Sequence, residues 1–177
     1  MFIDELIFPS YATLQRMTRE LRERNDLPNA DQQFLANIET HGWVVTKVFR
    51  RDGETGPDWA YSTGLFHSYS HAEIVIFGLD LDNMHTIVNN IGSEVKAGSH
   101  FESGNEYQGI LARYGCQFRL VDTRYYRDYF GCSIWFYEAD PFPVLQCFWP
   151  DREGYYPWDP KCDSGVAVLQ PLLFKPS

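Results

Sequence analysis

A run of apolar residues followed at once by an amphipathic pattern restricts the possible folds most strongly. The segment EIVIFGL, residues 73–79, is almost continuously apolar, as is typical of a central strand that is buried on both faces. Through residues 80–98, apolar side chains then recur at helical spacing along one side: Met84, Ile87, Val88, Ile91 and Val95. A buried strand that leads into a core-facing helix predicts a sheet covered by helices.

The remaining segments extend this picture to an α+β fold. Helical spacing of apolar residues predicts helices over 10–25 and 31–41, and a helical turn over 123–131. Strand-like composition marks residues 43–49, 59–65, 107–115, 116–122, 132–138 and 143–149. We therefore expect a mostly antiparallel sheet of about five to seven strands, with two or three helices packed on one face of it.

The length of 177 residues favours a single domain. Residues 1–30 are predicted to be an N-terminal extension that carries the amphipathic helix over 10–25, and residues 31–177 to form the α+β domain. The apolar tail GVAVLQPLLF, residues 165–174, is expected to dock on that domain.

Acidic residues outnumber basic ones, 24 to 15, which gives a formal net charge of −9. Binding to nucleic acid depends on cations that replace the counterions of the phosphates, so the charge argues against direct phosphate binding along a polynucleotide. The same charge favours contact with a basic protein partner. No pattern of residues predicts a cofactor, and nothing in the sequence fixes the oligomeric state.

The N-terminus and the cysteines indicate the cellular compartment of the protein and the redox state of its thiols. The first residues carry no basic segment before their apolar residues, so no signal peptide is predicted, and no apolar run is long enough for a membrane span. The four cysteines, Cys116, Cys132, Cys147 and Cys162, form no CxxC pair. We expect a cytoplasmic protein with reduced thiols.

Several ordered motifs resemble a known family. The chain carries Gly42-Trp43 before its first strand, YSTGL at 61–65, HAEIVIFGL at 71–79, and LQCFWPDREGYYPW at 145–158. These motifs resemble the bacterial and phage family called domain of unknown function 4262, over about residues 41–171. The chain departs from the family pattern mildly, for example at Ala72, where the family has proline. The resemblance implies a one-domain protein and no particular reaction.

The histidine pair in HSYSH, His67 and His71, is a weak candidate for a metal site. On a helix this spacing would place both imidazoles on one face, but the segment lies between two predicted strands. Neither HExxH nor clustered cysteines accompany it, so no metal is predicted, and a histidine that fixes the turn is the simpler interpretation. No sequence motif predicts a nucleophile, a general base or a phosphate-binding loop either, which favours a protein that is not an enzyme.

The aromatic and proline-rich segment 142–160 offers the other candidate surface. Alternation along 144–149 places Gln146 in a strand among apolar neighbours, where its amide needs partners. Candidate ligand- or partner-binding residues are Tyr61, His67, His71, Gln146, Trp149, Asp151 and Trp158. We expect a small acidic binding or regulatory protein that acts through protein contacts, in the manner of an immunity protein or inhibitor. The alternative is a small enzyme or ligand-binding protein with an aromatic and histidine-lined pocket, which acts either with or without a metal.

Overall fold

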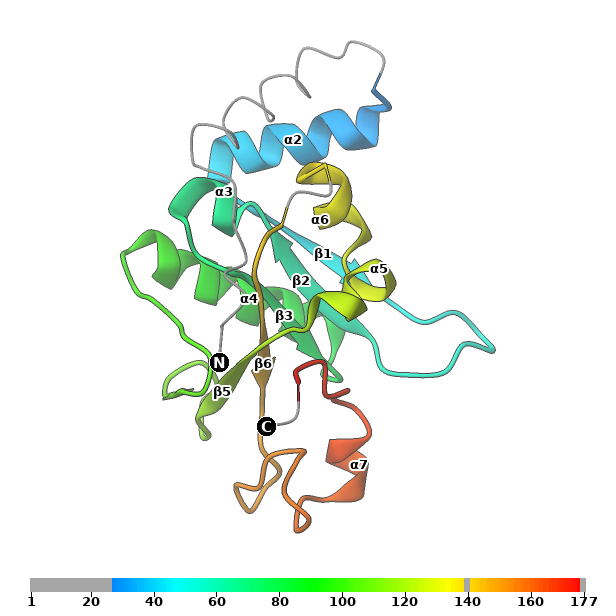
Figure 1. Cartoon of the computed structure of the whole chain (residues 1–177), viewed down its shortest axis with the longest axis vertical. Helices are drawn as coiled ribbons and strands as arrows, with labels where there is room; N and C mark the ends of the chain where they lie inside the picture. The colour runs from blue at the N-terminus through cyan, green and yellow to red at the C-terminus, as the bar shows by residue number, and fades with distance from the viewer. Residues whose placement is uncertain (1–26, 139–140, 176–177) are drawn as a thin grey trace, which may run out of the picture.

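Six strands form one mixed sheet in the computed structural model, which describes residues 27–138 and 141–175 (Figure 1). The strands are β1 (Val44–Val48), β2 (Trp59–Thr63), β3 (Glu73–Phe77), β4 (Glu106–Tyr107), β5 (Cys116–Leu120) and β6 (Val144–Phe148). Their order across the sheet is β1-β2-β3-β6-β5-β4. Every neighbouring pair is antiparallel except β3 and β6, which are parallel. This confirms the α+β class and the single, mostly antiparallel sheet.

Helices cover both faces of this sheet, whereas the sequence predicted helices on one face only. The helix α4 (Leu81–Lys96) packs on one face against β1, β2 and β3. The short helices α5 (Tyr126–Tyr129) and α6 (Gly131–Phe136) lie over the other face (Figure 1). The remaining helices are α2 (Asn29–His41), α3 (Leu65–Tyr69), α7 (Ser164–Ala167) and the 3-10 turn η1 (Thr123–Tyr125). The helix predicted over residues 10–25 lies outside the described residues.

The strand predicted over residues 132–138 is wrong, because these residues form most of α6. A short apolar run fits a strand and a buried helix equally well. Here Ser133 and Phe136, three residues apart, are buried on the helix side that faces the sheet. The Ser133 hydroxyl lies 2.7 Å from the hydroxyl of Thr63 at the end of β2, so the helix is anchored by a buried polar contact.

A close contact between α4 and Trp43, the residue just before β1, accounts for a glycine in the middle of the helix. A Cβ atom at Gly92 would lie 2.6 Å from the Trp43 ring, so only glycine lets the indole approach the helix this closely. The indole Nε1 donates a hydrogen bond of 3.0 Å to Oδ1 of Asn89, one turn earlier. Trp43 therefore fixes both the height and the rotation of α4 over the sheet.

A buried carboxylate ties the end of β2 to the start of β3. Glu73 is only 1% exposed. Its Oε1 accepts hydrogen bonds from the backbone N–H groups of Gly64 and Phe66, at 2.8 and 3.1 Å. The hydroxyls of Ser62 and Tyr137 each donate to the same carboxylate at 2.5 Å. Glu73 thus satisfies the backbone at the start of α3, where a helix leaves its first N–H groups without partners.

Candidate functional site

The side chain of Gln146 holds the C-terminal segment against the sheet. Its Nε2 donates a hydrogen bond of 2.8 Å to the carbonyl of Pro171, and its Oε1 accepts one of 3.3 Å from the N–H of Leu173. Both hydrogen-bonding functions of the amide are therefore used by the backbone of residues 171–173. The tail predicted to dock does so, and Leu173 is buried in the core.

A second glutamine repeats this arrangement next to the first. Gln170 accepts a hydrogen bond from the N–H of Trp149 and donates one to its carbonyl, at 3.0 and 2.9 Å. An amide that meets both backbone groups of one residue imitates a paired strand. The indole of Trp149 in turn donates to the carbonyl of Phe77 at 2.9 Å. Residues 170–175 are thereby attached along the end of β6.

Asp151 organises the loop that follows β6. One carboxylate oxygen accepts hydrogen bonds from the N–H groups of Glu153 and Tyr155, and the other accepts one from Asp163, all at 2.9 Å. These backbone hydrogen bonds lower the pKa of Asp151, with that from Asp163 the strongest. The residue therefore closes the loop 151–163 and keeps it in one conformation.

This loop presents Trp158 as the centre of an aromatic stack. The rings of Tyr156 and Trp158 lie 5.1 Å apart, with an angle of 5° between their planes. The guanidinium of Arg119 lies over the Trp158 ring at 4.9 Å, and Phe148 and Phe174 approach the indole edge-on. Stacking on an aromatic face holds a guanidinium in place and leaves its N–H edges available.

Arg119 and Trp158 line a cavity of about 860 Å³, which we call the arginine cavity. Its lining comes from Ser103, from the continuous stretch 119–125 that runs from β5 through η1, from the loop 151–163 and from the C-terminal segment. The residues are Ser103, Arg119, Leu120, Val121, Asp122, Thr123, Arg124, Tyr125, Trp158, Leu172, Phe174 and Lys175. A cavity of this size with an apolar wall and a few charged groups is typical of small-molecule sites.

The charges of the arginine cavity oppose those of the whole chain. Arg119, Arg124 and Lys175 contribute three positive charges, and Asp122 contributes one negative charge, so the lining has a net charge of +2 within a chain of −9. Arg119 uses Nη2 for a hydrogen bond of 3.2 Å to Gln117, while its buried Nε has no partner among the described residues. Ser103 accepts from the N–H of Leu120, so its own proton remains able to donate.

The two candidate histidines lie in different surroundings, because α3 ends between them. His67 is buried within α3 and meets the ring of Phe136 edge-on. His71 follows the end of α3, and its Nδ1 lies 2.7 Å from the carbonyl of Ala72, while its Nε2 accepts a hydrogen bond of 3.0 Å from the N–H of Phe101. Both nitrogens of His71 are thus used by backbone groups.

Tyr61 belongs to the buried core beneath α6, and its hydroxyl accepts a hydrogen bond of 3.2 Å from the N–H of Cys132. Of the seven residues proposed from sequence, Trp158 lines the arginine cavity and the other six do not. Gln146 and Asp151 contribute indirectly, since they hold the walls of that cavity. Within residues 27–138 and 141–175, no group of three or more His, Cys, Asp or Glu side chains is placed to hold a metal ion.

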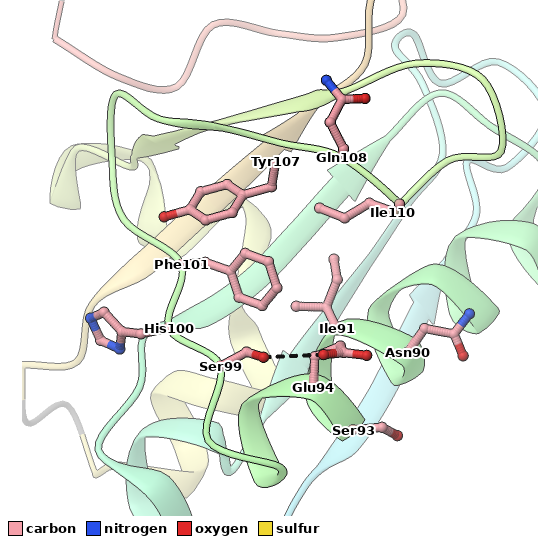
Figure 2. Close-up of a pocket in the computed structure, with 11 residues that line it drawn as sticks. Asn90, Ile91, Ser93, Glu94, Ser99, His100, Phe101, Tyr107, Gln108 and Ile110 are labelled. Carbon is pink, nitrogen blue, oxygen red and sulfur yellow. Dashed lines mark hydrogen bonds between the residues drawn. The ribbon is translucent and has the colours of Figure 1, made fainter.

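A second cavity, of about 680 Å³, lies between the end of α4 and the residues around β4 (Figure 2). Phe101, Ile91 and Ile110 turn toward one another in its middle, while His100 points away from them (Figure 2). The carboxylate of Glu94 at its rim accepts a hydrogen bond of 3.1 Å from Ser99. This cavity contains no arginine or lysine, so the arginine cavity has the stronger basis for recognising a charged ligand.

The residues that sequence reasoning missed are the cations of the arginine cavity. Arg119 alternates with apolar neighbours in β5, and Lys175 lies near the end of the chain, so nothing in their spacing marks a common site. Only the docking of the C-terminal segment brings Lys175 to the same cavity as Arg119. The one hint in the sequence was a basic residue, Arg119, within a predicted strand of an acidic chain.

The fold and the arginine cavity define a small α+β protein with a basic, aromatic-walled pocket. A family model described as a domain of unknown function matches residues 37–163, and the chain belongs to this family, domain of unknown function 4262. No curated protein and no solved structure matches the chain. The matched residues include Arg119, Arg124 and Trp158, whereas the C-terminal wall of the cavity lies beyond them. None of the helices within the described residues has the length and apolar character that crossing a membrane requires.

Proposed function

We propose that this protein binds an anionic ligand in the arginine cavity. The observation that carries the proposal is the Arg119 guanidinium, which stacks on Trp158 and borders a cavity of net positive charge in an acidic protein. A stacked guanidinium is already oriented, so less side-chain entropy is lost when an oxyanion meets its N–H groups. The surrounding leucine and aromatic side chains favour a ligand with an apolar part beside the anionic group.

Titration of the isotopically labelled protein with benzoate and with phenyl phosphate tests this function. We expect either anion to shift the indole N–H resonance of Trp158, because the ligand changes the environment of the guanidinium stacked on it. The variant Arg119→Gln should lose this response, because it removes the charge and the stacked fork of donors. A wild-type protein whose Trp158 resonance moves with neither anion would overturn the proposal.

Arg50 offers a matched control for the loss of Arg119. Its guanidinium also stacks on an indole, that of Trp59 at 4.8 Å, and its Nε also lacks a partner among the described residues. Arg50 does not line the arginine cavity. The variant Arg50→Gln therefore removes the same charge and the same kind of stacking, and it should bind both anions as the wild type does.

The sequence also led to the hypothesis of a regulatory protein that contacts a basic protein partner, and this stays a prediction. Its support is the net charge of −9. The arginine cavity would not attract such a partner, so a partner of this kind must use another surface. Affinity capture with and without residues 1–30, in the presence and absence of phenyl phosphate, separates a partner-binding surface from the anion site.

A further inference from the structure

We infer that the ligand of the arginine cavity is a small dianion, of the class of dicarboxylates and phosphomonoesters. This inference rests on the proposed anion-binding function and goes beyond it in naming the charge and the chemical class. The cavity is lined by two guanidinium groups, those of Arg119 and Arg124, and each lies over an aromatic ring.

Arg124, a second arginine in the lining, also lies over an aromatic ring, as Arg119 does over Trp158. Its guanidinium lies 5.2 Å from the centre of the Tyr125 ring, and both residues line the cavity. Arg124 is 57% exposed, so water and a ligand both reach it. Two arginines supported in this way can each offer paired N–H donors to an oxygen pair of one ligand.

Asp122 sets the number of negative charges that the cavity accommodates. Its carboxylate lies 3.1 Å from Nη2 of Arg124, and at 8% exposure it is far more buried than its partner. It is also tied to the backbone by a hydrogen bond from the N–H of Arg124. Asp122 therefore cancels one of the three positive charges, and the remaining +2 is neutralised by a ligand that carries two negative charges.

Polymeric anions fit these features poorly. The site has a volume of about 860 Å³, which suits a small molecule, and the chain as a whole carries a charge of −9. A polynucleotide would bring many phosphates against a chain whose net charge is −9. A small molecule places its charges only where Arg119, Arg124 and Lys175 are found.

A ligand series with one body and different charges tests the inference. At pH 7.5 phenyl phosphate carries two charges, since the second pKa of a phosphate ester is about 6, and phthalate carries one charge on each of its two carboxylates. Benzenesulfonate and benzoate carry one charge, and phenol carries none. By calorimetric titration at low salt, we expect each dianion to bind roughly tenfold more tightly than its monoanionic counterpart, and phenol not to bind. Comparing phenyl phosphate with phthalate distinguishes a phosphate from a carboxylate ligand.

The outcomes separate the inference from the proposed function. Equal affinities for dianions and monoanions would overturn the dianion class and leave anion binding intact. No binding of any anion would overturn both. The variant Arg124→Gln should reduce the dianion affinity to that of the monoanion, whereas Arg113→Gln, an exposed arginine outside the cavity, should change neither.

A variant that should bind the ligand more tightly cannot be confused with a variant that fails to fold. In Asp122→Asn, the amide oxygen still accepts the N–H of Arg124, but the lining charge rises from +2 to +3. Phenyl phosphate should then bind several-fold more tightly, and its affinity should fall more steeply with added salt. Unchanged or weaker binding of phenyl phosphate by a folded Asp122→Asn variant would contradict the role assigned to Asp122.

Discussion

The hydroxyl of Tyr137 donates a hydrogen bond of 2.5 Å to the carboxylate of Glu73, and both side chains are buried. Tyr137 directly follows α6 and Glu73 begins β3, so this contact joins the helical layer to the centre of the sheet. Burial raises the pKa of Glu73, while the hydrogen bonds from Ser62 and Tyr137 oppose that shift.

Removing the Tyr137 hydroxyl should therefore destabilise the protein more than an ordinary tyrosine hydroxyl would. We expect Tyr137→Phe to lower the free energy of unfolding by roughly 1.5–3 kcal/mol, the range for a hydrogen bond to a charged group. Tyr126→Phe is the matched control, since that hydroxyl donates to the neutral carbonyl of Phe142 at 2.7 Å. Its loss should cost about 1 kcal/mol. Urea denaturation of both variants measures the difference, and equal losses would contradict the special role of Glu73.

The buried imidazole of His71 should make stability depend on pH. Burial lowers the pKa of His71 below its usual value, and the neighbouring His100 adds to this shift. The unfolded chain then binds the proton more readily, so the free energy of unfolding rises with pH in the interval below about 6.5. This stabilisation is fully present above that interval and is lost as the pH falls through the folded pKa.

Denaturation midpoints measured between pH 7.5 and 5 check this expectation. His71→Gln should lower stability at pH 7.5 and flatten the pH dependence, because no imidazole remains to be protonated between Ala72 and Phe101. The exposed His41→Gln serves as the control and should keep the wild-type slope. A His71→Gln variant with an unchanged slope would show that another group carries the dependence.

Replacing Gln146 with leucine should release the C-terminal segment. The change leaves the carbonyl of Pro171 and the N–H of Leu173 without partners, at a cost of roughly 2–3 kcal/mol. Hydrogen exchange should become at least about tenfold faster at the Leu173 amide. Gln146→Glu retains an acceptor for Leu173 and should protect that amide better than leucine does. Full protection of Leu173 in the leucine variant would contradict this account.

Gly64 should tolerate no side chain. Its φ is +114°, and a Cβ atom there would lie 2.7 Å from the carbonyl oxygen of Gly42. We expect Gly64→Ala to cost more than about 2 kcal/mol, the sum of backbone strain and a steric clash with backbone. Gly53→Ala is the control, with φ of +91° and no atom within 4 Å, and should cost about 1–2 kcal/mol. Thermal unfolding of both variants separates the two effects.

The sequence predicted the fold better than the site because local patterns determine the elements. The apolar stripe from Met84 to Val95 becomes the buried side of α4, and the alternation along 144–149 places Leu145 and Cys147 in the core beneath α4. The error at residues 132–138 arose where an apolar run was too short to distinguish a helix from a strand.

The arginine cavity could not be predicted, because its lining combines Ser103, residues 119–125, Trp158 and residues 172–175, which are distant from one another in the chain. Gln146 was correctly expected to need polar partners, but spacing alone does not reveal that its partners, like those of Asp151, are backbone groups of residues 153–173. Trp158 was recognised as a candidate through its residue type. The sequence places Tyr125 next to Arg124, but only the fold brings Trp158 beneath Arg119.

The parallel pairing of β3 with β6 has a consequence for how the chain acquires its fold. Strand β3 ends at residue 77, while its neighbour begins at residue 144. During synthesis, β1, β2, β3 and α4 are complete long before that neighbour exists. The apolar edge of β3 stays unpaired meanwhile and can pair wrongly with another chain. Slow closure of this long-range contact should therefore limit both the folding rate and the yield of the protein at high expression.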